Sequence, residues 1–307
     1  MRVVVLGGSG FLGSHVADAL SAGGHEVVVY DTRESPYLLP EQTMVVGDIL
    51  DEKLLDRTVE GSEVVYNYAG IADIDECVER PVDTARLNVV GNCVALEAAR
   101  KAGVRRFVFA SSVYVYSESG AVYRSSKQAS ELFTEDYQTL FGLPYTIVRY
   151  GSLYGERAGE WNSIRRFIKQ GLETGAIVYH GTGDEIREWI HVRDAAKLSV
   201  DILGPEYENQ RVIITGTQSM RYRDFLEMIR EILGNAVTVS YEPSTRGAHY
   251  KITPYLFSPK LGYKLVSNPH IDLGQGLLAC IADVHKELHR EQHEEMGLLV
   301  DSDDAAS

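Results

Sequence analysis

The chain has 307 residues, of which 44 % are hydrophobic and 24 % are charged. These proportions are typical of a globular protein with a substantial buried core, and they exclude collagen-like and disordered chains. The 44 acidic residues outnumber the 30 Lys and Arg residues, and the net charge of −14 disfavours nucleic-acid binding because such a surface repels phosphates. No apolar run approaches the roughly 18–20 residues that span a bilayer, so we predict no membrane segment.

The cysteines and the first residues indicate the compartment. Cys77, Cys93 and Cys280 are far apart and lack the spacing of metal ligands, so we expect a reducing compartment and no metal site. An apolar strand is expected as early as Arg2–Leu6, which leaves no room for a signal peptide. We therefore predict a cytoplasmic protein.

Short apolar runs alternate with helical patterns through residues 1–150. The expected strands are Val3–Leu6, Glu26–Tyr30, Met44–Val46, Glu63–Asn67, Phe107–Ala110 and Thr146–Arg149. The expected helices are Phe11–Ala22, Asp51–Val59, Val82–Ala102 and Tyr123–Phe141. Continuous apolar strands that alternate with helices predict an α/β fold with a Rossmann-type, doubly wound parallel sheet.

The pattern loosens after Ser152 and becomes richer in turns. Helices near Ser163–Glu173 and Arg221–Leu233 predict a smaller, substrate-binding lobe over residues 151–285, with a strand near residues 211–215 that returns to the main sheet. We expect the last stretch, His285–Ser307, to begin as a fraying helix, and we assign residues 286–307 to a disordered acidic tail.

Three histidines near the end of the chain raise the question of a metal site. His285, His289 and His293 are spaced so that they share one helical face, and such a pair can bind zinc. Their charged neighbours favour a solvated helical face instead.

The first strand leads directly into a glycine run, GGSGFLG, and a helix follows. Glycines allow a tight turn and a close approach to a pyrophosphate, and the helix N-terminus supplies free N–H groups. The run fits the dinucleotide-binding spacing from either Gly7 or Gly8, so the register stays open, and a purely structural turn is the alternative. The position between a strand and a helix favours a dinucleotide. The expected contacts are Gly7, Gly10, Phe11, Leu12 and Gly13.

Acidic residues follow the second and third strands. Asp31 is placed to accept hydrogen bonds from the adenosine ribose and would repel a 2′-phosphate, which predicts NAD rather than NADP, although Arg33 could reach a phosphate. Asp48 and Ile49 are expected near the adenine. Alternatively, Asp48 caps the helix that is expected to start near Asp51.

Tyr123 is the only one of the 18 tyrosines with a lysine four residues later, Lys127. On a helix this spacing places both side chains on one face, and an ammonium beside a phenol stabilises the phenolate needed for acid–base chemistry. Upstream, the fifth strand delivers Ser111 and Ser112 to the carboxyl edge of the sheet, where ligands bind.

These motifs together resemble those of the extended short-chain dehydrogenase/reductases of the nucleotide-sugar epimerase/dehydratase type, over roughly residues 1–285. The matching segments are the glycine run with Asp31, Asn67–Gly70, Asn88–Asn92, Ser111–Ser112 with Val115–Tyr116, Tyr123 with Lys127, Arg149–Tyr150, Leu153–Gly155 and Arg187–Asp194. The resemblance implies NAD as cofactor and a nucleotide sugar as substrate. It also implies a homodimer through the helices Val82–Ala102 and Tyr123–Phe141.

The resemblance further implies residue roles. Tyr123 is the acid/base, Lys127 binds the nicotinamide ribose, and Ser112 hydrogen-bonds the reacting sugar hydroxyl. Arg187 resembles an arginine that binds the substrate diphosphate, and a surface arginine is the alternative. The remaining cofactor contacts are expected at Ala69, Gly70, Asn88, Ser111 and Tyr150. The remaining substrate contacts are expected at Tyr114, Ser152 and Asn162, the last of which is also a candidate helix cap.

Three departures from the family pattern bear on the reaction. Only six residues separate Tyr116 from Tyr123, where relatives carry a longer loop, so we expect an open active site. Ser152 stands where the family often has a diphosphate-binding asparagine. Val113 and Tyr114 replace the Asp-Glu pair of 4,6-dehydratases, which disfavours dehydration.

We predict an NAD-dependent epimerase that acts by transient oxidation at C4 of a nucleotide sugar. The alternative is a 4-dehydrogenase or 4-ketoreductase that releases its product. A non-catalytic NAD-binding regulator is a remote alternative, because such proteins tend to lose the tyrosine or the lysine that this chain retains.

Overall fold

The computed structural model describes residues 1–234, 236–243, 249, 251–252, 263–265 and 270–295. Its main layer is a parallel sheet with the strands β1 (Arg2–Leu6), β2 (Glu26–Asp31), β3 (Thr43–Val46), β4 (Val64–Asn67), β5 (Arg106–Ser112), β6 (Tyr145–Tyr150), β10 (Gln210–Ile214) and β13 (Tyr263–Leu265). Their spatial order is β13-β10-β6-β5-β4-β1-β2-β3. The order runs outwards from β1 on one side and from β4 on the other, which confirms the predicted Rossmann-type, doubly wound sheet.

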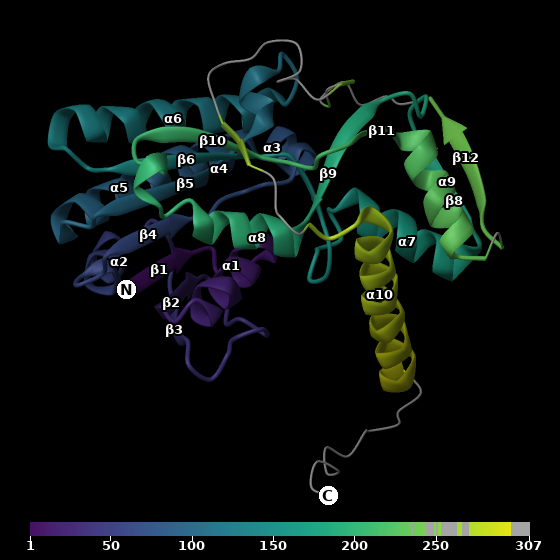
Figure 1. The fold of residues 1–307 in the computed structure, drawn as a ribbon, viewed down its shortest axis with the longest axis horizontal. Helices are drawn as coiled ribbons and strands as arrows, with labels where there is room; N and C mark the ends of the chain where they lie inside the picture. Colours follow the sequence, from purple (N-terminus) through teal and green to yellow (C-terminus); the bar gives the residue numbers. More distant parts are fainter. Residues whose placement is uncertain (235, 244–248, 250, 253–262, 266–269, 296–307) are drawn as a thin grey trace, which may run out of the picture.

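Helices cover both faces of this sheet (Figure 1). They are α1 (Phe11–Ala22) and α8 (Val192–Asp201) on one face, and α2 (Glu52–Val59), α5 (Gly91–Ala102) and α6 (Ala121–Phe141) on the other. Val3 and Val5 of β1 pack toward the first pair, whereas Val4 and Leu6 pack toward the second group. Burial of alternate residues on opposite faces explains why the strands are apolar throughout.

The helix expected at Val82–Ala102 is helical throughout but not uniform. It consists of α4 (Pro81–Thr84), a π-helical segment at Ala85–Val90, and α5. Asn88 lies in the π-helical segment, and its backbone carbonyl accepts a hydrogen bond from Ser130 Oγ on α6 at 2.9 Å. The π-helical segment therefore has a tertiary partner in α6, which helical periodicity does not reveal.

The smaller lobe is built mainly from the second half of the chain (Figure 1). It contains β7 (Ser152–Tyr154), β9 (Ile186–His191) and β11 (Ser219–Arg221) in one sheet, the pair β8 (Ala176–His180) and β12 (Thr238–Glu242), and the helices α7 (Ser163–Thr174), α9 (Tyr222–Ile232) and α10 (Leu273–Glu295). Within the range 151–285, however, α8, β10 and β13 belong to the main layer. The strand expected near residues 211–215 is β10, which pairs with β6.

The last helix extends further than the sequence predicts. α10 continues to Glu295, so residues 286–295 are helical where a disordered tail was expected. Val284 is buried in the lobe core, and Arg165 of α7 pairs with Glu287, so both contacts hold the helix on the lobe. Residues 296–307 lie outside the described residues.

The same helix carries the histidines considered as metal ligands. Nε2 of His285 lies 3.0 Å from Nε2 of His289, and the side chain of His293 is outside the described residues. Among the residues that the structure describes, no group of three or more His, Cys, Asp or Glu side chains could hold a metal ion.

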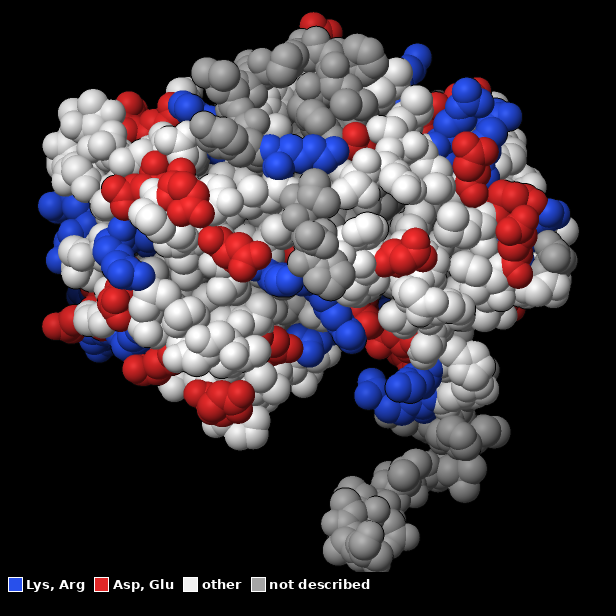
Figure 2. Space-filling model, in the orientation of Figure 1, with Lys and Arg blue, Asp and Glu red and all other residues white. Residues whose placement is uncertain are grey.

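Charged side chains of both signs are interspersed on the face shown in Figure 2, where the basic ones occur in separate small groups. Within the described part of the chain, no helix has the length and apolar character required to cross a bilayer.

Candidate active site

A cleft of about 2100 Å³ lies between the carboxyl edge of the main sheet and the smaller lobe. The loops after β1, β2, β4, β5 and β6 line it from the main layer, and α7, β8 and β9 line it from the lobe. In doubly wound sheets this edge, where the strand order diverges, is the place where ligands bind.

The glycine run forms a tight turn at one end of the cleft. Gly7 has a left-handed φ of +74°, and a Cβ there would lie 2.6 Å from the backbone nitrogen of Ala69. A Cβ on Gly13 would collide with the carbonyl oxygen of Gly7. The turn can therefore be this tight only while these positions have no side chain, and such a turn lets the backbone approach a pyrophosphate closely.

The structure favours one of the two registers that the sequence leaves open. The expected contacts Gly7, Gly10, Phe11, Leu12 and Gly13 all line the cleft, in the spacing that starts at Gly7. Gly8 is instead packed against the sheet, where a Cβ would lie 2.9 Å from the side chain of Val29. Gly10 is the N-cap of α1, so the free N–H groups of the first helical turn point to this end of the cleft.

The acidic residues after β2 and β3 lie beside this turn. Asp31, Arg33, Asp48 and Ile49 all line the cleft. Asp48 Oδ1 accepts a hydrogen bond from the backbone N–H of Leu50 at 2.9 Å, within its own turn. The N-cap of α2 is Asp51, so the alternative in which Asp48 caps that helix is wrong.

Further along the cleft lie Ala69, Gly70 and Tyr150. The Tyr150 hydroxyl lies 2.6 Å from Ser199 Oγ and 3.0 Å from the Tyr68 hydroxyl. Burial raises the pKa of Tyr150 to about 12, so this hydroxyl remains protonated at neutral pH.

Asn88 is not among the cleft-lining residues, although a cofactor contact was expected there. Its side-chain oxygen accepts from the backbone N–H of Ile71 at 2.7 Å, and its amide donates to the Ile71 carbonyl and to Ser126 Oγ. Through these hydrogen bonds, the Asn88 side chain holds the loop after β4 against the π-helical segment and α6.

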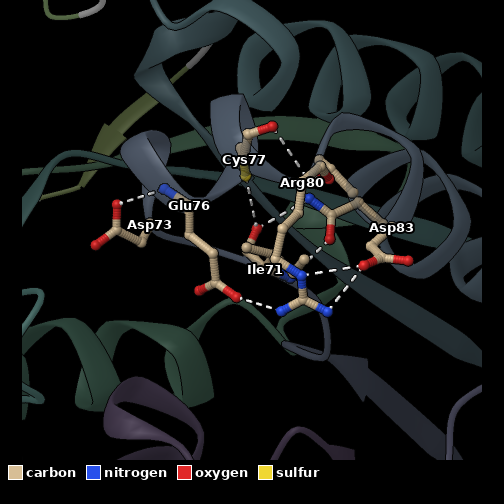
Figure 3. Close-up of polar contacts among 8 residues, drawn as sticks. Ile71, Asp73, Glu76, Cys77, Arg80 and Asp83 are labelled. Atoms are coloured by element: carbon tan, nitrogen blue, oxygen red, sulfur yellow. Dashed lines mark hydrogen bonds and ion pairs between the residues drawn. The ribbon is translucent and has the colours of Figure 1, made fainter. Parts of the chain in front are cut away.

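That loop continues into α3 (Ile74–Glu79), which forms the wall shown in Figure 3. Asp73 caps the helix by accepting from the backbone N–H groups of Asp75 and Glu76. The Arg80 guanidinium bonds Glu76 at 2.7 Å and Asp83 at 3.0 Å, and so joins α3 to α4. Three acidic residues, Asp73, Asp75 and Glu76, consequently line this side of the cleft.

The three predicted catalytic residues all belong to the cleft wall. Ser112 lies at the end of β5, while Tyr123 and Lys127 lie on α6, and all three line the cleft. Lys127 Nζ donates to the carbonyl of Ala110 at 2.8 Å and lies 5.8 Å from the centre of the Tyr123 ring. The Ser112 hydroxyl accepts a hydrogen bond from the backbone N–H of Tyr114 at 3.3 Å.

The environment of Lys127 changes its acidity. The side chain is 8 % exposed, and burial lowers its pKa to about 8, against the opposing effects of Cys77 and Glu131. The amine is therefore poised to change charge near neutral pH.

Ser111 also lines the cleft, but its hydroxyl is directed into the protein. Its Oγ donates to the carboxylate of Glu131 at 2.5 Å. This buried hydrogen bond competes with the cofactor contact that was expected of the Ser111 hydroxyl.

The predicted substrate contacts Tyr114, Ser152, Asn162 and Arg187 all line the same cleft. The Tyr114 hydroxyl lies 2.9 Å from His249 Nδ1, and its ring makes an edge contact with Tyr123. Asn162 caps α7 through the backbone N–H groups of Ile164 and Arg165, so the cap interpretation is confirmed.

Arg187 is a buried arginine in the cleft wall, which makes the alternative of a surface arginine wrong. The side chain is 5 % exposed, and its guanidinium lies over the ring of Tyr222. Nη1 donates to the backbone carbonyl of Ile186 at 2.9 Å.

Three further cleft residues carry no signal in the sequence. Trp161, which makes an edge contact with Phe11, lies in the loop before α7. His249 and Lys251 come from the segment after β12, and the Lys251 carbonyl accepts from the backbone N–H of Ile186 at 2.8 Å. None of the three belongs to a motif, so only the tertiary structure identifies them.

Comparisons with known proteins identify the family of this chain. Residues 3–214 match the model of the "NAD dependent epimerase/dehydratase family". The chain is 31 % identical over 302 residues to a putative UDP-glucose 4-epimerase of Methanocaldococcus jannaschii, with 90 % of this chain and 95 % of that protein covered. It is 27 % identical to a dTDP-glucose 4,6-dehydratase of Streptomyces antibioticus, with 92 % and 91 % covered.

A solved structure is similar as well. A UDP-glucose 4-epimerase of Thermus thermophilus, in complex with NAD, is 26 % identical with a TM-score of 0.78 and covers 93 % of this chain and 99 % of its own. NAD is the cofactor that the description of the matching family names. The chain belongs to the NAD-dependent epimerase/dehydratase family, of the extended short-chain dehydrogenase/reductase type.

Proposed function

We propose that this protein is an NAD-dependent 4-epimerase of a nucleotide sugar, acting by transient oxidation at C4. The observation that carries the proposal is the convergence of Ser112, Tyr123 and Lys127 on the cleft that also contains the glycine turn. The resemblance of the chain to epimerases supports the same reaction.

The residues of the glycine turn and the adjacent loops would hold NAD. The turn from Gly7 to Gly13 would receive the pyrophosphate, Asp31 the adenosine ribose, and Asp48 and Ile49 the adenine. Lys127 would keep its hydrogen bond to the Ala110 carbonyl and direct its remaining N–H groups to the nicotinamide ribose. Bound NAD would supply an acceptor for the C4 hydride and later return that hydride to the sugar.

The protein's own residues move the proton. The Tyr123 phenolate, stabilised by the Lys127 ammonium, accepts the proton of the C4 hydroxyl while the Ser112 hydroxyl hydrogen-bonds the same oxygen. The C4–H bond breaks as the C4=O bond forms. Once the 4-keto sugar had turned over and taken a hydride on its opposite face, Tyr123 would give its proton back to O4.

Arg187 is the residue we assign to the substrate diphosphate. Its guanidinium lies in the cleft wall, held by the Tyr222 ring and the Ile186 carbonyl, so it is ordered before substrate binds. A guanidinium suits a diphosphate because it donates several hydrogen bonds in one plane. Ser152, Tyr114 and Asn162 complete the part of the wall that we assign to the substrate.

Dehydration is disfavoured by the residues that follow Ser112. Val113 is apolar and buried, and Tyr114 bonds His249, so neither supplies the acid and base that eliminate water. A 4-dehydrogenase or 4-ketoreductase is the second candidate. The six-residue connection between Tyr116 and Tyr123 favours it, because a short loop gives a keto product a route out. The retained Tyr123 and Lys127 oppose a non-catalytic regulator.

The exposed apolar residues support a homodimer through α6 and the helical segment Val82–Ala102. Six of them lie along α4, the π-helical segment and α6, namely Val82, Val90, Leu132, Phe133, Leu140 and Phe141. Contiguous exposed apolar residues mark interaction surfaces. Light scattering of the wild type and of Leu132→Glu tests the dimer, which we expect only in the wild type.

We assign the enzyme to the cytoplasm, which the free thiols of all three cysteines support.

The experiment that tests the reaction uses a panel of UDP-, GDP-, dTDP- and CDP-sugars. Each is incubated with the enzyme and NAD, and products are separated and identified by mass spectrometry and NMR. The proposal predicts a C4 epimer of unchanged mass from at least one sugar. A product that is two mass units lighter would support the dehydrogenase, and one lighter by a water would support a dehydratase.

A further inference from the structure

A buried ion pair lies behind the catalytic residues. Glu131 of α6 and Arg149 of β6 are 6 % and 4 % exposed, and neither lines the cleft. Arg149 Nη2 lies 2.6 Å from Glu131 Oε2, and Nε lies 2.9 Å from Oε1, so the pair is bidentate. The reaction described above uses neither residue.

The other hydrogen bonds of this pair reach residues on both sides of Ser112 in the sequence. Glu131 Oε1 accepts from Ser111 Oγ at 2.5 Å, immediately before Ser112. Arg149 Nη1 donates to the Tyr116 hydroxyl at 2.6 Å, and the guanidinium stacks on the Tyr116 ring. Tyr116 ends the short 3₁₀ turn that begins directly after Ser112. Both ends of the segment that presents Ser112 are thereby tied to one ion pair.

The same carboxylate belongs to the catalytic helix. Tyr123, Lys127 and Glu131 follow at intervals of four residues on α6 and so share one face of that helix. Lys127 bonds the Ala110 carbonyl on β5, one residue before the Ser111 that Glu131 bonds. Two successive turns of α6 are therefore fixed to two successive residues of β5.

We propose that Glu131 and Arg149 are positioning residues, which set the distance between Ser112 and the Tyr123–Lys127 pair. The inference rests on the catalytic roles assigned to those three residues under the proposed function. Proton transfer needs its groups within hydrogen-bond reach of one oxygen, and a misplacement of about 1 Å can cost about 100-fold in rate. The directional bonds of the pair supply that precision, which apolar packing does not.

A purely structural role is the competing explanation, and a double variant separates the two. Replacement of a buried ion pair by apolar side chains of similar volume is often neutral for stability, whereas removal of one partner leaves a buried, unpaired charge. Glu131→Leu/Arg149→Met should therefore fold and lose only the directional bonds to Ser111 and Tyr116.

The variant is tested in the full chain with NAD and the nucleotide sugar that the wild type converts. We expect a Tm within about 4 °C of wild type, a kcat lower by about 30- to 100-fold, and KM values for the sugar that change by less than about threefold. We also expect a larger C4-deuterium isotope effect on kcat, because misplaced acid–base groups make the chemical step limiting. Loss of folded protein would lower kcat without changing the isotope effect.

A matched control lies at the opposite edge of the same strands. Arg106 at the start of β5 is also buried and bonds Thr146 Oγ1 at 2.8 Å and Glu208 at 3.1 Å. Arg106→Met should lower Tm and leave kcat per folded molecule and the isotope effect unchanged. Inactive wild type would contradict the proposed function, whereas an active wild type with an equally active double variant would contradict only the positioning role.

Two milder variants keep the test decisive if the double variant does not fold. Tyr116→Phe and Ser111→Ala each remove one bond from the pair. We expect each to lower kcat by about three- to tenfold, the equivalent of one ordinary hydrogen bond, and to raise the isotope effect. Wild-type kcat and isotope effect in both would overturn the proposal.

Discussion

The Asp31 carboxylate at the end of β2 accepts a hydrogen bond from the backbone N–H of Ser9, within the glycine turn, at 3.1 Å. Its other oxygen accepts from the backbone N–H of Arg33 at 3.3 Å. The carboxylate is thus held by the turn that we assign to the pyrophosphate and by its own loop after β2. Its negative charge cannot turn away from a ligand without breaking these bonds.

Cofactor preference follows from this carboxylate. We expect NAD(H) to bind at least tenfold more tightly than NADP(H), a difference of about 1.4 kcal/mol, because a 2′-phosphate would meet a fixed negative charge. Calorimetric titration measures both affinities. Asp31→Ala should narrow the difference, while Glu34→Ala, an exposed acidic neighbour outside the cleft wall, should preserve it. Equal or tighter binding of NADP by the wild type would refute the assignment.

Tyr123 is expected to act in the chemical step and not in cofactor binding. Tyr123→Phe should lower turnover by about 10²–10⁴, the usual scale of general acid–base catalysis, with NAD affinity nearly unchanged. Lys127→Ala should impair both. Tyr137→Phe is the matched control, since Tyr137 lies on the same helix with its hydroxyl near Glu97, away from the cleft. Near-normal turnover in Tyr123→Phe would disprove the acid/base role.

The pH dependence should reflect Lys127. Burial lowers the pKa of this lysine to about 8, so the ammonium that stabilises the phenolate is lost as pH rises through that value. We expect kcat/KM to fall above about pH 8. A guanidinium stays charged in this range, so the lower activity of Lys127→Arg should have no such alkaline decline. The same decline in both enzymes would assign it to another group.

Replacement of Arg187 should weaken binding of the substrate and leave binding of the cofactor unchanged. Loss of charge-assisted hydrogen bonds to a diphosphate is expected to raise the KM for the nucleotide sugar by about 10- to 100-fold in Arg187→Ala, with NAD affinity preserved. Arg223→Ala serves as control, because Arg223 pairs with Asp184 outside the cleft wall. Equal effects of the two substitutions on KM would remove the diphosphate assignment.

Much of the main sheet is predictable from local pattern alone. The bounds of α1 are those that the sequence predicts. The glycine turn marks the start of the helix, and the end of the helical apolar pattern marks its last residue. β13 was missed because it is a three-residue strand at the sheet edge, with too few residues for a pattern. The π-helical segment was missed because Asn88 is held by Ile71 and by α6, which lie far away in the sequence.

In the candidate site, too, local spacing predicts some features, and contacts between distant residues determine the others. Spacing identifies Tyr123 with Lys127, since residues four apart must share a helical face. Spacing cannot show that the Ser111 hydroxyl is directed to Glu131, or that the Asn88 side chain hydrogen-bonds the loop after β4. His249 lines the cleft although it follows β12 in the sequence, and no local signal predicts that position.

The fate of the C4 hydride tests the account most directly. A nucleotide sugar deuterated at C4 is incubated with the enzyme and NAD, without external oxidant or reductant, and product and absorbance at the NADH wavelength are followed together. Epimerisation predicts a C4 epimer that retains deuterium at C4, with no net accumulation of NADH. Stoichiometric accumulation of reduced cofactor together with a 4-keto product would contradict it and establish the dehydrogenase.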